Sequence, residues 1–228
     1  MSQKSNNSRT LVNIIGIPYL LFSIFLGDNS NIGIPFYSIM ILLIMILSIH
    51  EWNNLTSSEC FYIDCLNFVS ICSLFLIIFL FKSMSMVAIF LLVHILIGSL
   101  ITTLGASQKP LTILSTSIFG VIFIGICIGS LIIIRNFDYG LNITFMMFIS
   151  IWTCDTFAFF FGKKFGNRKL SPYLSPNKTW FGAISGIVGS IFIVLIFFIF
   201  FPISDFNLLD YFVFSLIFGV LGQIGDLL

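Results

Sequence analysis

The chain has 228 residues, of which 58% are hydrophobic and 8% are charged, with a formal net charge of +1. Its mean hydropathy is +1.13, and 29 residues are Phe. This composition leaves too little polar surface to solvate a globule of this size, so it disfavours the competing interpretation of a soluble all-helical protein.

The apolar residues form long runs along the whole chain. A membrane-spanning helix needs about 20 mostly apolar residues, and short polar loops separate about eight such runs. The runs lie at 11–27, 32–50, 61–81, 85–104, 111–134, 141–161, 181–203 and 209–228. The sequence therefore predicts an all-α, polytopic membrane bundle of about eight transmembrane helices. Because no soluble domain or repeat interrupts it, we expect one integral membrane domain over 1–228.

The positions of the cations predict an orientation, because positively charged loops stay on the cytoplasmic side. Lys4 and Arg9 precede the first run, and no small-residue cleavage pattern follows, so we expect a retained helix. With a cytoplasmic N-terminus, only Lys82 and Arg135 fall outside. The cytoplasmic cations are then Lys4, Arg9, Lys109, Lys163, Lys164, Arg168, Lys169 and Lys178. Eight cations on the cytoplasmic side against two on the other side predict that the N-terminus is cytoplasmic.

His94 lies in the middle of the fourth run. Polar residues inside membrane bundles commonly form hydrogen bonds between helices. We therefore expect a neutral His94 that is hydrogen-bonded to a neighbouring helix and has no chemical role.

One interhelical loop is substantial. Residues 162–180 carry five Lys or Arg, two Gly and two Pro, a composition that disfavours a continuous helix. We expect irregular backbone there, suited to cupping an anion. The simpler alternative is that these cations only set the topology and meet anionic lipid headgroups.

Two carboxylates approach this loop in the predicted topology. Asp155 lies in the sixth run about two helical turns before the loop, and Asp226 lies near the end of the eighth run. An Asp within a span is costly, so it usually pairs, binds a metal or lines a polar cavity. The structural alternative is that Asp155 only bonds Thr156, Trp152 or a loop lysine and locks two helices together.

The segment 175–179 collects hydrogen-bond donors beside a proline turn. Ser175, Asn177, Lys178 and Thr179 offer hydroxyl, amide and ammonium groups that suit phosphate oxygens. Magnesium bridges phosphates to one or two carboxylates. Together with Asp155 and Asp226, the segment indicates divalent-metal-assisted phosphate chemistry on a lipid.

These residues resemble motifs of the phosphatidate cytidylyltransferase, or CDP-diacylglycerol synthase, family: D-T-x-A-Y-x-x-G-R-x-F-G, S-P-x-K-T-x-E-G and G-x-x-G-D-L. Here Phe159 stands for Tyr, Lys163 for Arg and Phe181 for Glu. Because the family continues into a further signature and this sequence stops at Leu228, we expect the domain to be C-terminally incomplete. The matching positions are Asp155, Thr156, Ala158, Phe159, Gly162, Lys163, Phe165 and Gly166, then Ser175, Pro176, Lys178, Thr179 and Gly182, and finally Gly222, Gly225, Asp226 and Leu227.

The resemblance implies magnesium-dependent transfer of a cytidylyl group from CTP to phosphatidate, giving CDP-diacylglycerol and pyrophosphate. We expect Asp155, Lys178 and Asp226 to be catalytic, and both aspartates to organise Mg²⁺. The expected substrate contacts are Ser175, Asn177 and Thr179, with long-range attraction from Lys163, Lys164 and Arg168.

The resemblance also implies a homodimer among membrane lipids, in the cytoplasmic membrane of a bacterium, with no nucleic-acid partner. Three alternatives stay open. The first is a CTP-dependent lipid kinase acting on a polyprenol or similar alcohol. The second is a transporter in which Asp155 and Asp226 couple ions. The third is a truncated, inactive homologue.

Overall fold

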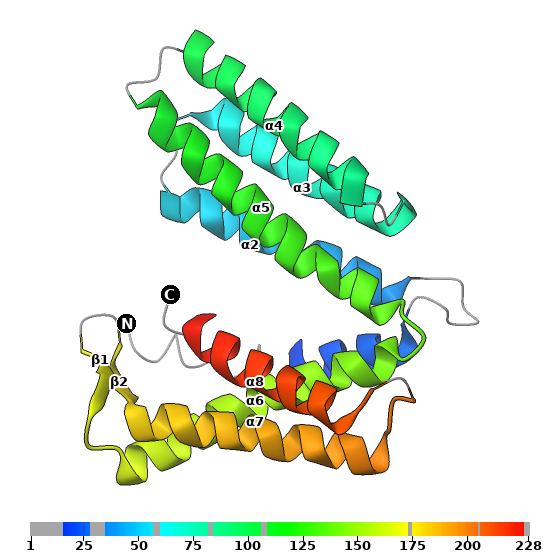
Figure 1. The fold of residues 1–228 in the computed structure, drawn as a ribbon. Coiled ribbons are helices and arrows are strands. Elements are labelled where there is room, and N and C mark those ends of the chain that lie inside the picture. Colours follow the sequence, from blue (N-terminus) through cyan, green and yellow to red (C-terminus); the bar gives the residue numbers. More distant parts are fainter. Residues whose placement is uncertain are drawn as a thin grey trace. The chain divides into compact units, whose positions relative to one another are not determined.

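The computed structural model describes residues 16–27, 35–56, 60–81, 84–105, 109–172, 175–204 and 206–225. The chain divides into two compact units, Met1–Asp138 and Tyr139–Leu228. The first unit contains a helix over Gly16–Leu26, α2 (Phe36–Thr56), α3 (Phe61–Phe81), α4 (Met84–Leu104) and α5 (Pro110–Arg135). The second contains α6 (Gly140–Phe165), β1 (Lys169–Ser171), β2 (Ser175–Thr179), α7 (Trp180–Phe200) and α8 (Leu208–Gly225) (Figure 1). The expectation of one integral domain stays a prediction.

Within the described residues, seven helices are long and apolar enough to cross a membrane, and Gly16–Leu26 is a shorter apolar helix. This confirms the predicted all-α, polytopic membrane architecture. Residues 11–15 of the first predicted run lie outside the described part of the chain. The predicted orientation, with a cytoplasmic N-terminus, stays a prediction.

Helix α2 continues six residues past its predicted end at 50, to Thr56. Its polar last turns are tied to neighbouring helices. Trp52 Nε1 donates to the carbonyl oxygen of Thr116 at 3.1 Å, and Asn53 Nδ2 donates to that of Asp64 at 3.4 Å. Because packing satisfies these polar groups, the helix extends beyond the point where its hydrophobicity falls.

A polar network joins the helices of the first unit at His94, which is 1% exposed. His94 Nδ1 is 2.7 Å from Ser70 Oγ, and Nε2 is 3.2 Å from Ser117 Oγ. Ser117 donates its one hydroxyl proton to Asn67 Oδ1, and Asn67 Nδ2 donates to Asn53 Oδ1 at 2.9 Å. A neutral imidazole protonated on Nε2 satisfies every bond. The predicted hydrogen-bonding role of His94 is confirmed.

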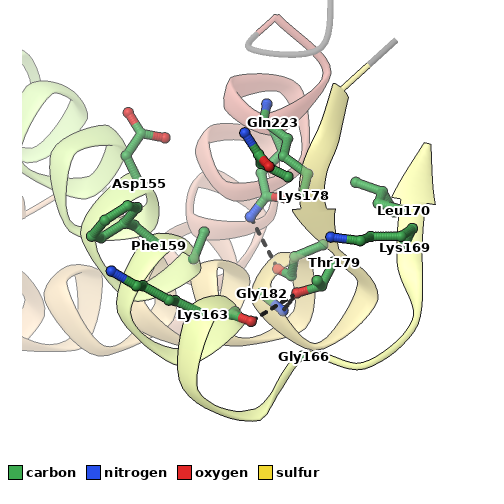
Figure 2. Close-up of a pocket in the computed structure, with 14 residues that line it drawn as sticks. Asp155, Phe159, Lys163, Gly166, Lys169, Leu170, Lys178, Thr179, Gly182 and Gln223 are labelled. Atoms are coloured by element: carbon green, nitrogen blue, oxygen red, sulfur yellow. Dashed lines mark hydrogen bonds between the residues drawn. The ribbon is translucent and has the colours of Figure 1, made fainter. Parts of the chain in front are cut away.

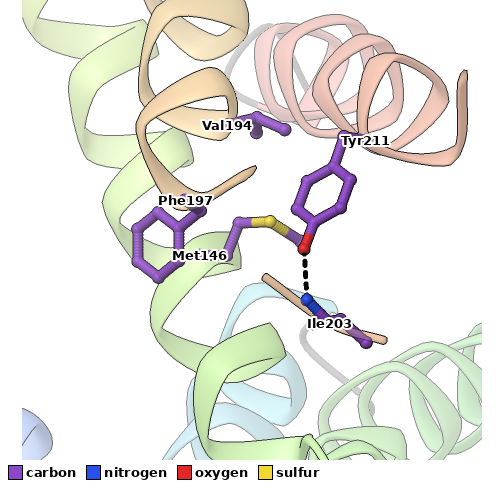
Figure 3. Packing of buried hydrophobic residues seen from close by; sticks show 5 residues of the cluster. All are labelled: Met146, Val194, Phe197, Ile203 and Tyr211. Carbon is purple, nitrogen blue, oxygen red and sulfur yellow. Dashed lines mark hydrogen bonds between the residues drawn. The ribbon is translucent and has the colours of Figure 1, made fainter. Parts of the chain in front are cut away.

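The core of the second unit lies where α6 begins, α7 ends and α8 begins. Met146, Val194, Phe197, Ile203 and Tyr211 are buried together, and the Tyr211 hydroxyl accepts a hydrogen bond from the Ile203 nitrogen at 2.8 Å (Figure 3). At about 1.5 Å per residue, the opposite ends of these helices lie roughly 25 Å away. The end of α6, the start of α7 and the end of α8 therefore lie outside this hydrophobic core, where polar side chains can gather.

No continuous helix runs through 162–180, as the composition predicts, but the described backbone is more regular than expected. Helix α6 runs on to Phe165, so Lys163 and Lys164 occupy its last turn. Strands β1 and β2 then pair antiparallel, with Lys169 opposite Thr179 and Ser171 opposite Ser175. Cations are favoured at a helix C-terminus by the helix dipole, which explains why these lysines extend α6 and do not end it.

Candidate active site

A pocket of about 510 Å³ lies in the second unit where α6 ends and α7 begins, beside the hairpin (Figure 2). Helix α8 adds one residue from its last turn. The lining residues are Asp155, Ala158, Phe159, Gly162, Lys163, Gly166, Lys169, Leu170, Asn177, Lys178, Thr179, Gly182, Ala183 and Gln223.

Thr179 connects the hairpin to α7 and is 5% exposed. It is the N-cap of α7 in extended backbone conformation, and its hydroxyl accepts a hydrogen bond from the Gly182 nitrogen at 3.1 Å. The same hydroxyl donates to the Gly162 carbonyl oxygen at 3.4 Å. One side chain thus starts α7 and ties it to the end of α6.

Glycines let α6 and α7 cross closely beneath the pocket. A Cβ at Gly182 would lie 2.7 Å from the carbonyl oxygen of Ala158 and 3.1 Å from the Gly162 Cα. A Cβ at Gly166 would collide with the Thr179 hydroxyl. The close crossing therefore requires the absence of side chains at these positions.

The lining charges favour an anion. The described residues of the pocket wall include three lysines, Lys163, Lys169 and Lys178, and one carboxylate, Asp155. Lys163 Nζ also lies 5.8 Å from the centroid of the Phe159 ring. The N-terminus of α7 adds its positive dipole end at Thr179 and Gly182. The pocket is suited to a ligand with several negative charges, such as a polyphosphate.

The model of the cytidylyltransferase family matches residues 7–228 of the chain. The chain belongs to the cytidylyltransferase family. Nine of the motif positions named in the sequence line the pocket. They are Asp155, Ala158, Phe159, Gly162, Lys163 and Gly166 at the end of α6, and Lys178, Thr179 and Gly182 at β2 and the first turn of α7.

Three bacterial relatives carry the name phosphatidate cytidylyltransferase. The protein of Bacillus subtilis is 43% identical over 109 residues, 46% of this chain and 39% of the relative. That of Staphylococcus saprophyticus is 34% identical over 102 residues, covering 44% and 38%. That of Rickettsia conorii is 34% identical over 115 residues, covering 48% and 50%. The chain spans at most about half the length of these relatives.

The structure brings five of the predicted site residues of this family member to one pocket: Asp155, Lys163, Asn177, Lys178 and Thr179. Asp155 is exposed in the second unit and lines the pocket, as expected of a carboxylate that lines a polar cavity. The Thr179 hydroxyl is engaged by backbone groups. The catalytic, metal and substrate roles of these residues stay predictions.

The other predicted residues lie elsewhere. Lys164 lines a separate groove along α6 with Thr156, Phe157, Phe160 and Phe161, and its Nζ is 5.2 Å from the Phe165 ring centroid. Arg168 and Ser175 are absent from the described pocket wall. Asp226 lies outside the described residues. Lysines 163 and 164 are adjacent in sequence, but the helical turn of about 100° per residue separates their faces.

Sequence reasoning does not single out four pocket residues: Lys169, Leu170, Ala183 and Gln223. In the sequence, Lys169 is only one cation of the basic loop. Gln223 carries a usable signal, because it is an uncharged polar residue in an apolar run and lies inside the G-x-x-G-D-L element. Such residues commonly bond between helices in membrane proteins.

Proposed function

We propose that this protein transfers the cytidylyl group of CTP to phosphatidate, producing CDP-diacylglycerol and pyrophosphate. The observation that carries the proposal is the pocket in which the family motifs converge, with three lysines, an aspartate and two side-chain amides on its wall. Membership of the cytidylyltransferase family and relatives named phosphatidate cytidylyltransferase support it.

The reaction needs positioning and charge neutralisation more than proton transfer. An oxygen of the lipid phosphate attacks the α-phosphorus of CTP, a new P–O bond forms, and the bond from that phosphorus to the pyrophosphate oxygen breaks. The attacking oxygen is already anionic at neutral pH, so no general base is required. Both substrates are negatively charged, so the protein has to reduce their mutual repulsion as it brings them together.

The lysines of the pocket would supply this positive charge. Lys178 is half-buried on β2 and Lys169 is exposed on β1, while Lys163 reaches the pocket from the last turn of α6. The side-chain amide of Asn177 adds donors for phosphate oxygens. These groups come from three elements whose relative position is set by Thr179 and the glycines beneath it.

Magnesium is the proposed cofactor. No group of three or more His, Cys, Asp or Glu occurs among the described residues, so a dedicated protein cage is not built there. Mg²⁺ is usually held by one or two carboxylates together with substrate phosphates, a pattern that Asp155 on the pocket wall fits. Asp155 and Asp226 would hold it, and the ion would neutralise charge on the triphosphate.

The proposed setting is the cytoplasmic membrane of a bacterium. The pocket lies at the ends of membrane-length helices, a position where a lipid phosphate and a water-soluble nucleotide can meet. We place the pocket on the cytoplasmic side, following the distribution of Lys and Arg in the sequence. A homodimer is part of the same proposal, and cross-linking in native membranes tests it.

Label position in the nucleotide separates this function from its alternatives. The purified protein, as the 228-residue chain and in any longer natural form, would be reconstituted with phosphatidate, Mg²⁺ and CTP labelled at either the α- or the γ-phosphate. A cytidylyltransferase places only the α-label in the lipid. A CTP-dependent kinase offered a polyprenol or similar alcohol places only the γ-label there. Absence of lipid label in every form would contradict both.

A further inference from the structure

We propose that Gln223 is a positioning residue that holds the end of α8 at the pocket. The kinetic part of this inference rests on the proposed function, whereas its structural part does not. Gln223 lies in the last turn of α8 and is the one described residue of that helix on the pocket wall. Figure 2 shows Gln223 among the residues that line the pocket, which also include the hairpin lysine Lys178.

Gln223 takes part in a ring of hydrogen bonds that joins the three helices of the second unit. Its Nε2 donates to the carbonyl oxygen of Ala183 on α7 at 3.0 Å. The Ser185 hydroxyl of α7 donates to the carbonyl oxygen of Phe157 on α6 at 3.3 Å. The Cys154 thiol of α6 contacts the carbonyl oxygen of Gly219 on α8 at 3.6 Å.

The Gln223 amide and the Cys154 thiol also contact each other, because Gln223 Nε2 donates to Cys154 Sγ at 3.4 Å. Helix α7 leaves room for this contact. Its Gly186 has no side chain, and a Cβ there would collide with Gln223 Nε2 and come within 2.9 Å of the Cys154 carbonyl oxygen. The amide of Gln223 is therefore seated in a space made by Gly186 and closed by the thiol of Cys154.

The two glycines nearest Gln223 in the last turn of α8, Gly222 and Gly225, have no side chain that could make a similar contact. Among the residues that the structure describes, a Cβ at Gly225 would meet nothing within 4 Å, and one at Gly222 would meet only Ile151 Cγ1 at 4.0 Å. These two glycines therefore make no close contact with the described residues that would hold the last turn of α8.

The kinetic test uses Q223A and Q223E in the reconstituted protein. Glu has nearly the same shape but no N–H, so its oxygen would face the Ala183 carbonyl without a proton between them. We expect kcat for CDP-diacylglycerol formation to fall about 10- to 100-fold in both variants, with a smaller change in KM for CTP, because a displaced α8 misplaces groups needed in the transition state.

The matched control is S190A. Ser190 is buried on α7, and its hydroxyl donates to the Ser215 carbonyl oxygen of α8 at 2.8 Å, so it forms the same kind of interhelical bond away from the pocket wall. A general loosening of the bundle would affect S190A and Q223A alike. An equal loss of kcat in the two would overturn the positioning role.

A second readout needs no enzymatic activity. Cys154 is 1% exposed and contacts the Gln223 amide. The other four thiols, Cys60, Cys65, Cys72 and Cys127, are partly or fully exposed. With those four replaced by Ser, N-ethylmaleimide should label Cys154 about tenfold faster in Q223A than in the parent, and at the parent's rate in S190A. An unchanged rate in Q223A would overturn the inference. A parent without transferase activity would contradict the proposed function alone, and labelling would then decide the role of Gln223.

Discussion

The hydroxyl of Thr179 accepts a hydrogen bond from the Gly182 nitrogen at 3.1 Å and donates one to the Gly162 carbonyl oxygen at 3.4 Å. Two glycines on neighbouring helices are thus bound to one threonine that ends the hairpin. The backbone frame of the pocket depends on this residue, whereas its charge comes from the lysines around it.

Loss of the Thr179 hydroxyl should therefore destabilise the second unit and misalign the hairpin. In T179V the N-cap is lost, and we expect about 1 kcal/mol of destabilisation with a clear fall in transferase activity. T179S keeps the hydroxyl and should retain most of both. Thermal unfolding in detergent and the lipid-label assay measure the two effects. Full activity in T179V would show that the cap does not support the site.

The adjacent lysines of α6 provide a sharp test of pocket position. Lys163 lines the pocket and Lys164 lines the groove on another face of the helix. K163A should raise KM for CTP or phosphatidate about tenfold, because it removes a charge from the polyphosphate site. K164A should change KM by a factor of about two at most, since Lys164 is exposed and lines the other groove. The reverse order would place the substrates on the other face of α6.

Lys178 should matter most for the chemical step, because it is the half-buried lysine of the three on the pocket wall. K178A should lower kcat about 100-fold or more, while membrane insertion and expression stay unchanged. K178R, which keeps the charge, should recover part of the activity. A K178A protein with parental turnover would remove this residue from the proposed mechanism.

Asp155 is the residue through which a magnesium dependence should be visible. In D155N, the Mg²⁺ concentration needed for half-maximal activity should rise about tenfold or more, because a neutral amide is a poorer ligand for a hard cation. The control is T156V, a change in the adjacent hydroxyl, which bonds the Trp152 carbonyl oxygen within α6. A D155N variant that loses thermal stability with an unchanged magnesium requirement would support the helix-locking alternative.

His94 should contribute stability to the first unit and nothing to turnover. In H94F, the hydroxyls of Ser70 and Ser117 lose their shared buried partner, and we expect about 1–3 kcal/mol of destabilisation. H50F changes an exposed histidine and serves as the control. Unfolding measured by thermal denaturation should separate the two variants, and kcat of the folded protein should be equal in both.

Hydropathy along the sequence is sufficient to predict the membrane helices. The predicted ends of α3, α4 and α5 agree with the structure to within one residue, because these helices begin and end at the change from apolar to polar sequence. The motifs around Asp155 and Lys178 likewise indicate a site from residue types and spacing alone. The apolar runs and the motifs can both be read from neighbouring residues in the sequence, without knowledge of tertiary contacts.

Tertiary structure decides what hydropathy does not. Helix α2 extends to Thr56 because neighbouring helices accept hydrogen bonds from its polar residues. Helix α6 extends to Phe165 because the helix dipole favours lysines in its last turn. A hydrophobicity profile includes neither effect. The sequence predicts a substrate-attracting role for both Lys163 and Lys164, and the turn of α6 assigns them to different faces. Gln223 is seated at the pocket through the missing side chain of Gly186 on α7, since contacts between residues distant in the chain depend on how helices cross.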